Sequence, residues 1–188
     1  MNVRRFRVLL LPLAAVLIFA AMEYRLSQPD GPRTALRTPH GPPRATAPAL
    51  EGIDSANRYF RLNRYLGRQE VIVVFFDGAA GANGNPVLAE LKKYTQTLRS
   101  RGIHVIAVSS ALPQQNRQAD FETPVPFVLV TDPDQVWKYH RTWGCLDENT
   151  GTAIPRTFFI DRAGRTPVEE GRPVEVSNPL SMIQNRLQ

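Results

Sequence analysis

The chain has 188 residues, of which 43% are hydrophobic and 21% charged, with one Cys and a formal net charge of +6. These values exclude a fully disordered chain, a collagen-like repeat and a small domain held together by disulfides. The basic charge invites a nucleic-acid-binding interpretation, but it is concentrated at one end. Residues 1–50 hold seven Arg against two acids, whereas residues 51–188 hold 16 basic and 15 acidic residues. We therefore expect no nucleic-acid partner.

Residues 1–25 are predicted to be a signal anchor or a signal peptide. Three Arg within the first seven residues precede the uncharged apolar run Val8–Met22, a pattern that both kinds of segment share. As a helix, the stretch Phe6–Tyr24 would be ~28 Å long, close to the ~30 Å thickness of the hydrocarbon layer. Phe19 stands where a cleavage site needs a small residue, which favours an uncleaved anchor in the membrane.

Arginines ahead of an apolar run keep the N-terminus in the cytoplasm and send the following chain across the membrane. The domain is therefore expected on the extracytoplasmic side, in the periplasm or at the cell exterior, and cleavage would make the protein secreted. Residues 26–50 are rich in Pro and Arg and are predicted to be a disordered linker. A globular domain is predicted to occupy residues 51–188.

Residues 51–188 alternate between apolar runs typical of buried strands and amphipathic stretches typical of helices. Strands are expected at Val71–Phe76, Ile103–Ser109, Phe127–Val130 and Thr157–Ile160. Helices are expected at Ile53–Gly67, from Pro86 to Arg101, at Gln114–Phe121, from Asp132 to Trp143 and at Asn178–Leu187. The strand–helix–strand order in the first half specifies a right-handed βαβ unit. The prediction is an α/β fold, with a mixed central β-sheet flanked by helices on both sides.

Three segments carry a family resemblance. They are Val71–Phe76, which ends in an aromatic pair; Ile103–Ser109 together with Pro126–Pro133; and Ile154–Gly164, which is I-P-R-T-F-F-I-D-R-A-G. In this order they resemble the thioredoxin-like superfamily, in its redoxin branch of AhpC/TSA peroxiredoxins and TlpA/ResA-type thiol-disulfide proteins. The resemblance implies a thioredoxin-like fold and an antioxidant or oxidoreductase activity. The Pro of the third motif is commonly cis in this family, and the sequence leaves the state of the Ile154–Pro155 bond open.

The resemblance also implies where the catalytic thiol should lie. In these proteins a Cys at the N-terminus of the helix after the first strand is the nucleophile, because the helix dipole and adjacent N–H groups lower its pKa. The peroxiredoxin-type Cys would fall at about Gly84 and its Thr partner at about Gly81. The thioredoxin-type pair would fall at about Ala80 and Asn83. None of these is Cys, and the single Cys of the chain is Cys145.

Two functional hypotheses follow. The first is a degenerate redoxin, or pseudoenzyme, that binds or scaffolds a protein or peptide at Pro155, with Gly81 and Gly84 as further contacts. The alternative is a thiol-dependent peroxidase or disulfide oxidoreductase of AhpC/TSA type that uses Cys145, with Arg156 beside it. Whether the chain is an enzyme stays open between them. No cofactor is expected, and no metal, because the three His residues lack metal-ligand spacing.

Overall fold

The computed structural model of the protein describes residues 42–132 and 137–187. The predicted membrane segment at residues 1–25 and the predicted linker as far as residue 41 lie outside these residues. Across the described part of the chain, no helix combines the length and the apolar composition that crossing a bilayer requires.

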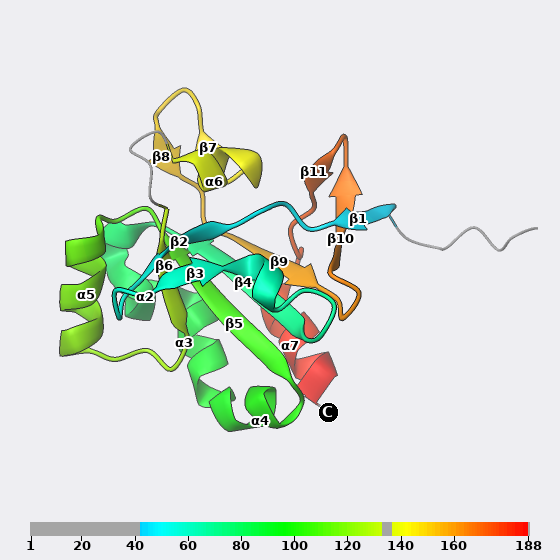
Figure 1. Ribbon diagram of the computed structural model, residues 1–188, viewed down its shortest axis with the longest axis horizontal. Helices are drawn as coiled ribbons and strands as arrows, with labels where there is room; N and C mark the ends of the chain where they lie inside the picture. Colours follow the sequence, from blue (N-terminus) through cyan, green and yellow to red (C-terminus); the bar gives the residue numbers. More distant parts are fainter. Residues whose placement is uncertain (1–41, 133–136, 188) are drawn as a thin grey trace, which may run out of the picture. The chain divides into compact units, whose positions relative to one another are not determined.

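A six-stranded mixed β-sheet forms the centre of the domain (Figure 1). Its strand order is β3-β2-β6-β5-β4-β9, in which β4, β5 and β6 are parallel, while β9 pairs antiparallel with β4 and β2 pairs antiparallel with β6. The strands are β2 (Glu51–Asp54), β3 (Tyr59–Arg61), β4 (Glu70–Phe76), β5 (Ile103–Ser109), β6 (Val128–Thr131) and β9 (Arg156–Ile160). The predicted α/β fold with a mixed central sheet is confirmed.

Helices and two small sheets complete the described chain. The helices are α2 (Gly81–Gly84), α3 (Pro86–Lys93), α4 (Thr95–Ser100), α5 (Pro113–Glu122), α6 (Lys138–Thr142) and α7 (Pro179–Leu187), with 3-10 turns η1 (Leu62–Arg64) and η2 (Gly78–Ala80). One small sheet joins β1 (Arg44–Thr46), β10 (Arg165–Glu169) and β11 (Arg172–Pro173), and the other pairs β7 (Leu146–Asp147) with β8 (Thr152–Ala153).

Strand β4 divides the core in two. Every side chain from Val71 to Phe76 is at most 1% exposed, and successive side chains of a strand point to opposite faces of its sheet. Val71, Val73 and Phe75 pack on one face with Trp143 and Phe158. On the other face the strand packs against helices α3, α4 and α7, through Ile72, Val74, Phe76, Leu88, Leu91, Leu98 and Ile183. An unbroken apolar strand is what two covered faces require.

Residues 53–67 form a hairpin and a 3-10 turn, so the predicted helix Ile53–Gly67 is wrong. The Asp54 carboxylate accepts a hydrogen bond from the backbone N–H of Arg58 at 2.7 Å and another from its Nε at 2.9 Å, which closes the turn between β2 and β3. Asn57 adopts a left-handed conformation in that turn, with φ of 59°. Arginines at every third or fourth position match the pattern of a solvent-exposed helix face. The segment forms a strand instead, because β2 pairs with β6 in the central sheet.

The folded unit also begins before residue 51. It starts at Pro42, and β1 pairs antiparallel with β10. Ala47 and Leu50 belong to the core on the Phe75 face of β4. Residues 42–50, assigned to the linker from their Pro content, therefore contribute a strand and two core side chains to the domain.

Two further helix predictions need adjustment. The segment from Pro86 to Arg101 is split into α3 and α4 at Tyr94, whose ψ of 14° departs from helical values. Of the helix predicted from Asp132 to Trp143, residues 133–136 lie outside the described residues, and α6 begins at Lys138. The Asp132 Oδ2 accepts hydrogen bonds from the N–H groups of Tyr139 and His140, in the first turn of α6, at 2.9 Å.

Because β4 lies in the core, replacing Phe75 should affect stability far more than replacing the exposed Phe121. Phe75 is fully buried and its ring contacts those of His140, Trp143 and Phe158. Phe75→Ala should lower the free energy of unfolding by about 3–5 kcal/mol. Phe121→Ala removes the same ring from a position that is 85% exposed, and should change it by less than about 0.5 kcal/mol. Urea unfolding measures both, and equal effects would contradict the assignment of β4 as the core strand.

Candidate functional site

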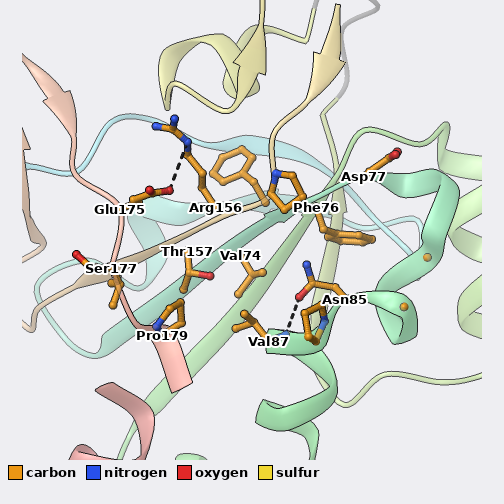
Figure 2. Close-up of a pocket in the computed structure, with 16 residues that line it drawn as sticks. Val74, Phe76, Asp77, Asn85, Val87, Arg156, Thr157, Glu175, Ser177 and Pro179 are labelled. Atoms are coloured by element: carbon orange, nitrogen blue, oxygen red, sulfur yellow. Dashed lines mark hydrogen bonds and ion pairs between the residues drawn. The ribbon is translucent and has the colours of Figure 1, made fainter. Parts of the chain in front are cut away.

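A cavity of about 460 Å³ opens where β4 ends and β9 begins. Its walls come from the loop after β4, the first turn of α3, the start of β9 and the segment 175–179 (Figure 2). Val74 and Phe76 of β4, together with Val87 and Pro179, give the cavity an apolar lining. These elements meet because β4 and β9 are antiparallel neighbours, so the end of one strand lies beside the start of the other.

The loop after β4 is built from small residues because it runs close to neighbouring backbone. A Cβ on Gly78 would lie 2.2 Å from the Ala111 Cβ, closer than side chains can approach. The Gly78 N–H donates to the Ser110 Oγ at 3.0 Å, and the Asp77 carboxylate accepts from the Ala79 N–H at 3.0 Å. Gly81 has φ of +66°, a conformation that favours glycine. These contacts fix the loop as one wall of the cavity.

Most of the residues selected from the sequence are brought together here. Gly81, Gly84, Pro155 and Arg156 all line the cavity. The Ile154–Pro155 peptide bond is trans. Asn83 is turned elsewhere, since its Nδ2 donates to the carbonyl of Thr123 at 3.1 Å. The positions that the resemblance assigns to a peroxiredoxin thiol and its partner therefore line the cavity, without a thiol at either.

Asn85 caps the N-terminus of α3, the helix end where the resemblance places a thiolate. Its Oδ1 accepts hydrogen bonds from the N–H groups of Val87 at 3.0 Å and Leu88 at 3.1 Å. Free N–H groups in the first turn of a helix are the donors that stabilise an anion there. A carboxamide from the chain itself already satisfies two of them, so the helix end is stable without a thiolate.

Arg156 and Glu175 form the charged rim of the cavity (Figure 2). The Arg156 Nε lies 3.4 Å from the Glu175 Oε2, an ion pair in which that buried Nε makes no hydrogen bond. The Val176 N–H donates to the Thr157 carbonyl at 2.8 Å, which holds this segment against β9. Sequence reasoning missed Glu175 and Ser177, because only this long-range pairing brings them to the cavity.

Cys145 is not among the residues that line the cavity. It is fully buried in the core that contains Phe75 and Trp143, and of these Phe75 also lines the cavity. Its Sγ donates to the Trp143 carbonyl at 3.6 Å. Burial raises the pKa of the Cys145 thiol far above its usual value, and the nearby positive charge of Arg156 offsets this only in part. A thiol in such surroundings is a poor nucleophile.

The cavity is lined by polar side chains that could bind a ligand, and no nucleophile–base pair such as Cys–His or Ser–His is among its lining residues. Neither Cys nor His is among its lining residues, whose polar side chains include those of Asp77, Thr157 and Ser177. A hydroxyl nucleophile needs an adjacent base such as His. Within residues 42–132 and 137–187, no three His, Cys, Asp or Glu side chains are grouped in a way that could hold a metal ion.

Comparison with known protein families identifies the family of this chain. Residues 43–166 match the AhpC/TSA family. The chain therefore belongs to the AhpC/TSA family, a class of thioredoxin-fold proteins. No curated protein matches the sequence.

Solved structures share the fold at low sequence identity. The thioredoxin domain of a thiol-disulfide oxidoreductase from Bacteroides vulgatus is 18% identical, with a TM-score of 0.56 over 77% of this chain and 96% of that domain. A peroxidoxin from Mycobacterium tuberculosis is 14% identical, with a TM-score of 0.57 over 79% of this chain and 95% of that one. Peroxiredoxin Q from Xanthomonas campestris is 14% identical, with a TM-score of 0.58 over 73% of this chain and 87% of that one.

Proposed function

We propose that this protein is a degenerate redoxin that binds a polypeptide segment in the cavity beside Pro155 and performs no thiol chemistry there. The observation that carries the proposal is the separation of thiol and cavity. Gly81 and Gly84 line the cavity and Cys145 does not, while Cys145 is fully buried with a raised pKa. Peroxide reduction and disulfide exchange both start from an accessible thiolate.

The chemistry of the cavity favours a peptide as its occupant. Its base and sides are apolar, through Val74, Phe76, Val87 and Pro179, and would cover an apolar side chain. At the rim, the Arg156 Nε faces the Glu175 carboxylate, and the Arg156 side chain as a whole is 34% exposed. A guanidinium carries five N–H donors, so its exposed part can donate to a backbone carbonyl of a bound peptide.

The alternative, a peroxidase or oxidoreductase that uses Cys145, is supported by membership of the AhpC/TSA family. One local contact also favours it. Arg156 lies close to the Cys145 segment, since a Cβ on Gly144 would stand 3.8 Å from its Nη1. An Arg beside a thiol favours the thiolate. We place this alternative second because burial outweighs the effect of Arg156 on the Cys145 pKa.

Filling the cavity tests the proposed function. Gly84 is an exposed lining residue, so Gly84→Phe should occupy the cavity without entering the core. Binding of a library of extended peptides that carry Leu, Val or Phe should weaken by roughly tenfold or more, the loss expected when about 1.4 kcal/mol of contact is removed. Isothermal titration with the best library member measures the change.

Ala89→Phe is the matched control, because it adds the same ring at an exposed position of α3 outside the cavity lining. It should leave peptide affinity unchanged. Thermal melts of both variants establish that they are folded. Equal affinities for Gly84→Phe, Ala89→Phe and the unaltered chain would rule out this cavity as the peptide site.

The location of the domain is a second proposal, drawn from the sequence. We infer that residues 1–25 anchor the protein in a membrane, with the domain on the extracytoplasmic side, because an arginine-flanked apolar run of this length retains the N-terminus in the cytoplasm. The full chain should sediment with membranes, resist alkaline extraction and keep its N-terminal residues. A mature N-terminus after residue 22 in the soluble fraction would show cleavage and secretion instead.

A further inference from the structure

A second cavity, of about 340 Å³, lies at the other end of the parallel strands from the candidate site. Ile103, His104 and Val105, at the start of β5, line it, whereas the candidate site lies beyond the end of β4. Pairing of β5 with β6 begins only at Ile106. The cavity therefore lies where the first residues of β5 extend past β6, between α4 and the β2–β3 turn.

The charged groups of this cavity are mostly basic. Arg58, Arg99 and His104 line it, and Asp54 is its only carboxylate among the residues described. The charge of Asp54 is already compensated, because its Oδ2 accepts from Arg58 at Nε (2.9 Å) and at Nη2 (2.8 Å). With His104 neutral, the charges of Arg58 and Asp54 cancel. The net charge of +1 in the lining is then that of Arg99.

Next to these charges the wall is apolar and aromatic. Leu98, Phe127 and Val128 line the same cavity. The Tyr65 ring packs against the His104 ring, with 5.1 Å between the ring centroids. The cavity thus combines one uncompensated positive charge with apolar side chains, in a volume large enough for a ring or a short alkyl chain.

We propose that this cavity binds a small organic carboxylate, with its anionic group at Arg99 and His104 and its apolar body against Leu98 and Phe127. A net charge of +1 suits a monoanion, whereas a phosphate monoester carries close to two negative charges at neutral pH. The proposal is independent of the peptide site, because the two cavities share no lining residue.

Protonation of His104 gives the site a pH dependence. Burial lowers the pKa of His104 below its usual value, and the positive charge of Arg99 lowers it further. The other charged or titratable groups around it are Arg58 and Asp54 of the β2–β3 turn and Tyr65 after η1. A bound carboxylate stabilises the imidazolium, so affinity should rise as the pH falls toward the lowered pKa of His104.

Benzoate and its neutral analogue benzamide test the proposal on the full chain, solubilised in a neutral detergent. Benzoate should shift the imidazole resonances of His104 in a saturable manner and raise its pKa, whereas benzamide should do neither. Arg99→Gln should weaken benzoate binding by about tenfold. Phenyl phosphate should bind less tightly than benzoate at pH 7.5.

The matched control is Arg162→Gln, which removes the same charge from an exposed position outside the cavity lining and should leave benzoate affinity unchanged. His104→Gln identifies the resonance and removes the pH dependence. The proposal is overturned if benzoate gives no saturable shift, if benzamide shifts His104 equally, if phenyl phosphate binds more tightly, or if the two Arg variants weaken binding alike.

Discussion

Burial of both faces of β4 is the constraint on which the rest of the domain depends. Side chains from Val71 to Phe76 alternate between two cores, so each face of the sheet must be covered by its own layer. Helices α3, α4 and α7 cover one face, and α6 with the chain before β4 covers the other. The candidate site exists because β4 ends at Phe76, where the chain turns through a loop of small residues beside the start of β9.

The thiol lies outside the lining of the cavity. Val71, Val73 and Phe75 of β4 belong to the core that contains Cys145 and Trp143, and Ile72, Val74 and Phe76 belong to the opposite core. The end of β4, from Val74 to Phe76, lines the cavity. A thiolate at the family position would lie at the start of α3, where Asn85 now caps the helix with its own side chain. The cavity at the end of β4 therefore has no thiol in its lining, and Cys145 is buried in the core that contains Phe75 and Trp143.

Strong local signals made much of the fold predictable. The β-branched and aromatic runs of β4 and β5 specify buried strands, because no amphipathic helix has such composition. The hairpin at β2 and β3 was not predictable, since its spaced arginines match a helix and only contact with β6 distinguishes the two. In the site, motif order located Gly81, Gly84, Pro155 and Arg156. Glu175 reaches Arg156 through pairing between distant segments, and the burial of Cys145 is a tertiary property that no local pattern encodes.

The most direct test of the account is the rate at which hydrogen peroxide oxidises Cys145 in the native full chain. Burial and a raised thiol pKa predict a rate below that of free cysteine at pH 7 and no turnover of peroxide with added reductant. Unfolding in guanidinium should raise the rate to that of free cysteine. Native oxidation orders of magnitude faster than free cysteine, with peroxide turnover lost in Cys145→Ser, would contradict the account and establish the thiol peroxidase alternative.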